Sequence, residues 1–248
     1  MGREGHLAVG LLSGFVAFSL PLIFHDTRHL WRPEAADNNG ESPPSPPHHH
    51  YHEEDANAPE ARFRRAINDG NLEEAKAVLA ENSRELLEAE HYHGNTPMFE
   101  AARSGHIEVV RWLLAEGAEV DKVNEWGDAP VQEAATMGHF DIVWLLADRG
   151  ANLTRTHDNL HSGLLLSAVR HRSVDALRQL HERGVDLSTR HWNGNTVLHE
   201  AARTGENEMV SWLIGNGINI DALNDSEETA LVEAAQMGHF ELVSKLLD

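Results

Sequence analysis

The chain has 248 residues, no cysteine and a formal net charge of −20, from 20 Lys and Arg against 40 Asp and Glu. This length allows one or two domains, and the missing thiols exclude disulfides, thiolate zinc sites and cysteine nucleophiles. The segment 1–58 has 3 basic and 8 acidic residues, and the segment 59–248 has 17 basic and 32 acidic residues. Because both parts repel polyanions, binding to nucleic acid is disfavoured and a basic protein or peptide partner is favoured.

Residues 1–30 form an N-terminal hydrophobic segment. The 18 residues from Leu7 to Phe24 carry no charge, and as a helix they extend roughly 27 Å, just enough to cross a thin bilayer. We therefore predict an uncleaved transmembrane anchor at residues 7–24. Two alternatives stay open: a cleaved secretory signal peptide, because Ala17-Phe18-Ser19 fits the small-x-small cleavage pattern, and a mitochondrial or merely hydrophobic tail.

Membrane topology is weakly constrained, because Arg3 precedes the apolar run while Arg28 and Arg32 follow it. We place the C-terminal part of the chain in the cytosol, as a single-pass membrane protein. The alternative is a secreted or luminal protein after signal-peptide cleavage. Glycosylation sequons at Asn152 and Asn224 would be used only in that case.

Residues 31–58 are rich in proline, histidine and acidic residues and have no apolar face that could offset the entropy of ordering, so they predict a disordered linker. His48, His49, His50 and His52 could bind a transition metal weakly. Without a fixed geometry around them, a solvated low-complexity stretch is favoured over a metal site.

The rest of the chain repeats itself with a period of 33 residues. The segment that starts at Gly94 returns at Gly127 and, 67 residues further on, at Gly194. The intervening copy is degenerate, with Ala168-Val169 where the others have two alanines. The copies span residues 94–126, 127–160, 161–193, 194–226 and 227–248, after a divergent first copy at residues 59–93.

Each copy predicts two short helices. In the copy from Gly94, Thr96-Pro97 starts a first helix that ends at Gly105. A second helix, residues 106–115, carries its apolar residues on one stripe and ends at Gly117. Because two short helices cannot bury such stripes alone, the copies must stack. In the divergent copy, Ala66 lies 35 residues before Ala101, so two surplus residues belong in its loop.

The recurring motif T-P-x-x-x-A-A-x-x-G-H-x-x-x-V-x-x-L-L-x-x-G resembles the ankyrin repeat. The resemblance implies an all-α repeat fold, an ankyrin-type solenoid of helix-turn-helix units joined by β-hairpin loops, with about five repeats plus the divergent N-terminal one. The family's T-P-L-H is intact nowhere and comes closest at Thr196-Val197-Leu198-His199. Histidine-centred hydrogen bonds typical of the family are therefore expected only at His199.

The resemblance also implies a scaffold that presents loop tips and first-helix faces to a protein partner. Trp126 and Trp192 fall at the tips, where they predict anchors for the partner; the alternative is that each ring lies across the neighbouring hairpin and shields it. Trp112 and Trp212 occupy an apolar slot of the second helix and are expected in the core. The candidate partner-binding residues, all expected to be exposed, are Tyr92, Arg103, Glu125, Trp126, Asp128, Met137, Trp192, Asn195, Arg203 and Met237.

No catalysis is predicted. His106, His139 and His239 occupy one repeated position after a glycine, where the resemblance implies a structural histidine. No G-x-S-x-G, H-E-x-x-H or phosphate-binding glycine loop is present, and the membrane ankyrin type of acyltransferase would need a cysteine. We expect a non-enzymatic scaffold without catalytic residues, cofactor or metal.

Two expectations concern the ends of the chain. The repeats should fold without the first 58 residues, because every stacked copy follows Pro59. The last copy keeps apolar residues such as Leu231 and Leu247 on a face without a polar cap, so its helices should fray unless something, for example a second copy of the chain, covers them.

Overall fold

The computed structural model describes residues 57–154 and 163–247, apart from the side chain of Trp192. All described residues belong to one compact unit, Tyr51–Asp248. The predicted anchor at residues 7–24 and nearly all of the predicted linker lie outside the described residues.

The described residues form α-helices and short 3-10 helices, without a β-strand. The first helices of the copies are α1 (Pro59–Asn68), α3 (Pro97–Ser104), α5 (Pro130–Thr136), α7 (Leu164–Arg170), α9 (Val197–Thr204) and α11 (Ala230–Gln236). The second helices are α2 (Leu72–Glu81), α4 (Ile107–Glu116), α6 (Phe140–Asp148), α8 (Val174–Glu182), α10 (Asn207–Gly215) and α12 (Phe240–Leu247). The 3-10 helices are η2 (Arg84–Glu88), η3 (Tyr92–Gly94) and η4 (Trp192–Gly194).

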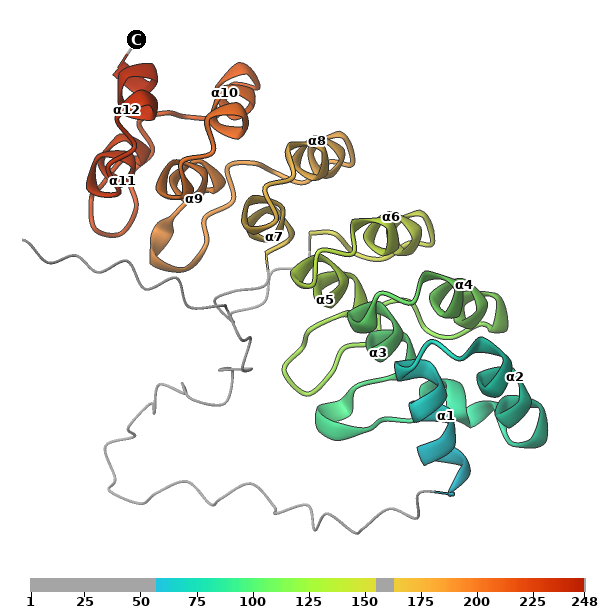
Figure 1. Cartoon of the computed structure of the whole chain (residues 1–248). Helices are drawn as coiled ribbons and strands as arrows, with labels where there is room; N and C mark the ends of the chain where they lie inside the picture. Colours follow the sequence, from blue (N-terminus) through green and yellow to red (C-terminus); the bar gives the residue numbers. More distant parts are fainter. Residues whose placement is uncertain (1–56, 155–162, 248) are drawn as a thin grey trace, which may run out of the picture. The chain divides into compact units, whose positions relative to one another are not determined.

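Neighbouring copies stack through equivalent helices, as the sequence period predicts. Each first helix packs against the second helix of its own copy, and each from α1 to α9 also packs against the first helix of the next copy. Figure 1 shows the odd-numbered helices in one row, the even-numbered helices in a second row, and the hairpin loops at the outer edge of the first. The predicted ankyrin solenoid is therefore confirmed, although the hairpin loops that the structure describes form turns without extended strands.

Local chemistry starts and ends the helices at the predicted places. In α3, the Thr96 hydroxyl accepts a hydrogen bond from the Phe99 amide (3.2 Å), Pro97 occupies the first turn, and Gly105 ends the helix with φ of 78°. Helix α4 ends at Gly117 with φ of 89°. Both glycines adopt a left-handed conformation that other residues reach only at a cost.

Paired alanines let adjacent first helices approach closely. In α3, α5 and α9 both alanines of the pair are fully buried, as are leucines and valines of the second helices behind them, such as Val110 and Leu113. Trp112 and Trp212 pack against this core while part of each ring stays accessible. In the divergent first copy, the surplus residues lie in the loop that contains η2, which buries Leu86 and Leu87.

Within residues 57–154 and 163–247, no helix combines the length and the apolar character needed to span a bilayer.

Candidate functional site

Backbone hydrogen bonds join successive hairpin tips. The Glu125 amide donates to the His93 carbonyl (2.8 Å), and 100 residues later the Asp225 amide donates to the Asn193 carbonyl (3.0 Å). His93 and Asn193 have left-handed φ values of 62° and 59°. The tips are thereby fixed relative to their neighbours and present a preorganised edge.

A buried asparagine network lies beneath these tips. Asn124 Nδ2 donates to Asn95 Oδ1 (3.2 Å), and Asn224 Nδ2 donates to Asn195 Oδ1 (2.9 Å). The Asn224 side-chain oxygen also accepts from the Ser226 and Glu228 amides (2.9 and 3.0 Å).

Two residues of the predicted partner surface are buried. Asn195 and Asp128 were expected to be exposed partner contacts, but both are buried. Asn195 Oδ1 accepts from Asn224 of the next hairpin, and the Asp128 amide donates to Asn124 Oδ1 (2.9 Å). These residues hold the hairpins in place rather than facing a partner.

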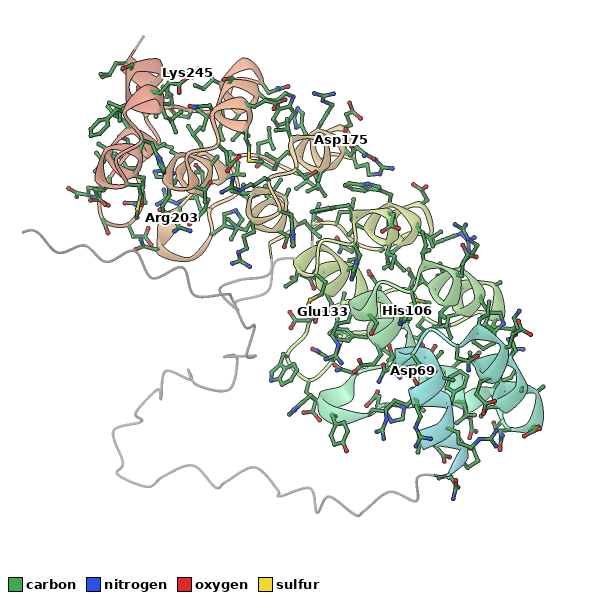
Figure 2. All side chains as sticks on the ribbon, viewed as in Figure 1. Asp69, His106, Glu133, Asp175, Arg203 and Lys245 are labelled. Carbon is green, nitrogen blue, oxygen red and sulfur yellow. The ribbon has the colours of Figure 1, made fainter. Side chains whose placement is uncertain are left out.

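The first helices carry buried carboxylates next to arginines. Glu100 accepts from Asn95 Nδ2 (2.8 Å) and pairs with Arg103 (2.7 Å). Glu200 makes the equivalent contact with Arg203 (2.6 Å). Figure 2 labels Arg203 on the first-helix row, away from Lys245 on the second-helix row.

Glu133 and Glu233 are buried at the same position of the following copies, on α5 and α11. Two equivalent patches result, 100 residues apart: the first patch comprises Glu100, Arg103, Glu133 and Met137, and the second patch comprises Glu200, Arg203, Glu233 and Met237. The sequence analysis missed the four glutamates, although the recurring Glu-Ala-Ala was visible in the repeat.

Like charge accumulates in the second patch. Burial, together with the neighbouring carboxylates Glu228 and Glu200, raises the pKa of Glu233, while Arg203 and His199 oppose that rise. A cation placed here would relieve the repulsion among the carboxylates.

The degenerate copy interrupts the row of glutamates. Ser167 replaces glutamate on α7, and its buried Oγ has no hydrogen-bond partner among the described residues. Burial lowers the pKa of Arg170, against the effect of Glu200. Burial also lowers the pKa of His191. Glu200 opposes this lowering, and Arg170 adds to it.

Three predicted partner residues are exposed apolar side chains: Tyr92, Met137 and Met237 are 56%, 41% and 51% accessible. The Arg64 guanidinium lies over the Tyr92 ring, 5.3 Å from its centroid. Glu125 is exposed at its tip, beside the His93 ring.

Trp126 is half-buried. Its ring lies 4.2 Å from the His93 ring of the preceding hairpin, centroid to centroid, at an interplanar angle of 34°. Of the two alternatives from the sequence, this geometry is that of a ring lying across the neighbouring hairpin. Trp192 lies in η4, but its side chain is outside the described part of the structure.

The repeated histidines are structural. His199 Nδ1 accepts from the Thr196 amide (3.2 Å), and its Nε2 lies 3.1 Å from the Glu228 carbonyl. The rings of His106, His139 and His239 cover Gly70, Gly105 and Gly205 of the preceding copy. His171 covers Gly138 in the same way. It lies two residues before Ser173, which occupies the histidine position in that copy, so the motif did not indicate this contact.

The two sequons differ in accessibility. Asn152 is exposed, and its Oδ1 accepts from the Thr154 amide and hydroxyl (both 2.9 Å). Asn224 is buried in the asparagine network. Of the two side chains, only that of Asn152 is accessible to a glycosyltransferase in the folded protein.

Solved structures share this fold at low identity. One is a chain from the complex of a predatory endopeptidase with an immunity protein from Bdellovibrio bacteriovorus, at TM-score 0.69 and 23% identity, covering 75% of this chain and 96% of that one. The human ASB11 ankyrin repeat domain has a TM-score of 0.66 and 22% identity, and the match covers 75% of this chain and 82% of that one. An Acinetobacter baumannii ankyrin repeat domain has a TM-score of 0.65 and 24% identity, and the match covers 75% of this chain and 95% of that one.

Two curated relatives match in part. An L-asparaginase from Dirofilaria immitis is 26% identical over 149 residues, 60% of this chain and 25% of that protein. A protein named as an ankyrin repeat protein, from Rickettsia bellii (strain RML369-C), is 33% identical over 75 residues, 29% of this chain and 41% of that protein. The chain thus spans less than half the length of either relative.

The family model for ankyrin repeats (3 copies) matches residues 54–157 and 165–248. These ranges cover most of the chain and contain every described helix, apart from Leu164 at the start of α7. The chain therefore belongs to the ankyrin repeat family.

Proposed function

We propose that this protein is a non-enzymatic scaffold, tethered to a membrane through residues 7–24, whose repeats bind a basic protein partner. Ankyrin repeats bind protein partners. We infer that the partner of this chain is basic from the carboxylates of the two patches. The observation that carries the proposal is the pairing, in each patch, of an exposed methionine with buried carboxylates on the first helices.

Lysine and arginine side chains suit such a patch. A methionine thioether packs flexibly against their aliphatic stems, while carboxylates attract their charged heads. Arg103 and Arg203 already neutralise part of each patch. Carboxylates remain in excess around Glu233, whose pKa is raised first by burial and then by Glu228 and Glu200.

Selection from a random peptide library displayed on phage, with the full chain as target, tests this role. We expect enrichment of peptides rich in lysine and arginine, whose affinity falls as NaCl rises from about 50 to about 500 mM. Met137→Lys and Met237→Lys should each weaken binding roughly tenfold, because each removes the thioether and adds a charge that repels a basic peptide. Leu223→Lys is the matched control, since Leu223 is exposed and apolar but outside both patches. Acidic peptides, or binding insensitive to both methionine variants, would contradict the proposal.

Flotation of the full chain with lipid vesicles tests the tether separately. Binding to neutral phosphatidylcholine vesicles should be lost in Leu11→Asp/Phe15→Asp, because charge in an apolar span is costly. The secreted or luminal alternative predicts instead a mature protein that begins after residue 19 and carries a glycan on Asn152.

A further inference from the structure

The copy between the two patches lacks the carboxylate that its neighbours carry on their first helices. In the row of first helices, α7 lies between α5 and α9 (Figure 1). The four other first helices from α3 to α11 have a glutamate at one equivalent position: Glu100, Glu133, Glu200 and Glu233. Helix α7 has Ser167 there, and it contains a cation, Arg170, but no acidic residue. The sign of the charge is therefore inverted at the centre of the row.

Helix α9 shows what the missing carboxylate does in a neighbouring copy. Arg203 donates to Glu200 Oε2 from both Nε and Nη2 (3.0 and 2.6 Å), across one turn of the same helix. Arg170 occupies the position of Arg203 on α7, and it is accessible to solvent. Because a serine precedes it by one turn where α9 has Glu200, helix α7 presents a cation at the surface without a carboxylate of its own.

Two polar atoms near Arg170 lack a hydrogen-bond partner among the described residues. One is Ser167 Oγ, one turn before Arg170 on the same face of α7, and Ser167 is completely buried. The other is His191 Nε2. Burial lowers the pKa of His191, and the charge of Arg170 lowers it further, so these two side chains lie close together. A buried polar group without a partner is costly, and unpaired hydroxyl and imidazole dipoles can turn toward an incoming anion.

We propose that the central copy binds an acidic side chain of the same partner whose basic residues bind the two patches. This inference rests on the proposed function, because the partner reaches the central copy from the patches on either side. A carboxylate suits the site, since it can accept two parallel hydrogen bonds from the planar guanidinium of Arg170. The row of first helices thus selects a partner segment whose charges follow the order basic, acidic, basic.

The packing of the helices sets the spacing of these charges. The first patch lies on α3 and α5, and the second on α9 and α11. Packed helices lie about 8–10 Å apart, so the middle of each patch is roughly 12–15 Å from α7. An extended peptide advances about 3.3 Å per residue, so roughly four residues separate the acidic side chain from the basic residues on each side.

Three synthetic peptides, titrated with the full chain and followed by fluorescence anisotropy, test this order. The first peptide has a lysine pair at each end and one glutamate in the middle, with glycine and serine spacers of the length given above. The second has glutamine in place of the glutamate, and the third has the glutamate moved to one end. The first should bind about tenfold more tightly than the second, the effect of one charge-assisted hydrogen bond, although its net positive charge is smaller. The third should bind no more tightly than the second.

Two variants of the chain locate the acidic subsite. Arg170→Gln should remove the preference for the first peptide over the second. Ser167→Glu should also remove it, by supplying the carboxylate that the four other helices already accommodate at this position. Arg178→Gln, on an exposed position of α8, is the matched control and should keep the preference. Thermal unfolding followed by circular dichroism checks that each variant folds, and Arg170→Gln decides the matter if Ser167→Glu does not.

The second peptide separates failure of this inference from failure of the proposed function. If it binds and the first binds no more tightly, the acidic subsite is overturned while the basic partner stands. A preference that survives Arg170→Gln, or a third peptide that binds as tightly as the first, overturns the subsite in the same way. If none of the peptides binds, the proposed function fails, and the inference fails with it.

Discussion

Arg172 and Glu206 form an ion pair across the junction of two copies, with Nε and Oε1 3.2 Å apart. At the equivalent places of other junctions a glycine lies beneath a histidine ring, as Gly105 does beneath His139. Arg172 adopts the glycine-like conformation, with φ of 53°. The arginine thus keeps a strained backbone while the ion pair replaces the contact between ring and glycine.

Replacing Arg172 with glycine should stabilise the protein. A left-handed conformation costs a residue with a side chain about 1 kcal/mol. The ion pair that is lost contributes less, because the Arg172 side chain is 74% accessible. Chemical denaturation should therefore show a higher midpoint for Arg172→Gly, and Glu206→His in that background should add further stability. Arg178→Gly, on the exposed side of α8, is the control and should destabilise by about 1 kcal/mol. A lower midpoint for Arg172→Gly would show that the ion pair outweighs the strain.

The histidine rings should make some glycines far less replaceable than others. A Cβ on Gly105 would lie 2.6 Å from the His139 ring, whereas a Cβ on Gly117 has open space, although both residues have left-handed φ values. Gly117→Ala should cost about 1 kcal/mol from backbone strain alone, and Gly105→Ala at least about 1 kcal/mol more. Urea denaturation of both variants measures the difference. Equal losses would mean that the ring moves aside freely.

Glu233→Gln should stabilise the protein at neutral pH. The pKa of Glu233 is raised above its ordinary 4.5, chiefly by burial, so the folded state binds its proton more tightly than the unfolded state does. Its carboxylate therefore costs stability that develops as pH rises through 4.5 and the raised pKa. The gain in melting temperature for Glu233→Gln should be largest near pH 7 and fade below about pH 4.

Glu241→Gln, on an exposed position of α12, is the control for this pH series and should leave the melting temperature nearly unchanged at each pH. A gain for Glu233→Gln that persists at low pH would point to packing rather than charge.

Trp126 and His93 should be energetically coupled. Their rings lie 4.2 Å apart, and such contacts contribute about 1 kcal/mol beyond the area that they bury. A double-mutant cycle with Trp126→Ala and His93→Ala, followed by denaturation, measures the coupling. If Trp126 also anchors the partner, Trp126→Ala weakens binding of the selected peptides about tenfold. Zero coupling would indicate that the contact is incidental.

The sequons should behave differently when the chain is directed into a secretory pathway. Asn152 is exposed and Asn224 is buried, so the glycan should be attached to Asn152. Glycosidase treatment should remove it and shift the mobility of the chain. Asn152→Gln should abolish the mobility shift, and Asn224→Gln should not remove it. Modification of Asn224 would mean that the glycan is added before the hairpin folds.

The sequence was sufficient to predict the repeat architecture, because its determinants are local. The 33-residue period, the Thr96-Pro97 start and the glycines at positions 105 and 117 act within one copy, through helix caps and backbone conformation. The structural role of His199 could be predicted for the same reason, since its first partner, Thr196, is three residues away.

The tertiary structure alone decided which polar side chains face solvent. Asn195 and Asn224 are buried because their side chains bond to each other between successive hairpins, 29 residues apart in sequence. His171 covers Gly138 from a position that the motif does not assign, and Phe240 is exposed because no further copy is packed against α12 among the described residues. In each case the deciding contact lies between successive hairpins or copies, and a period shows that copies stack without showing which side chains meet at each junction.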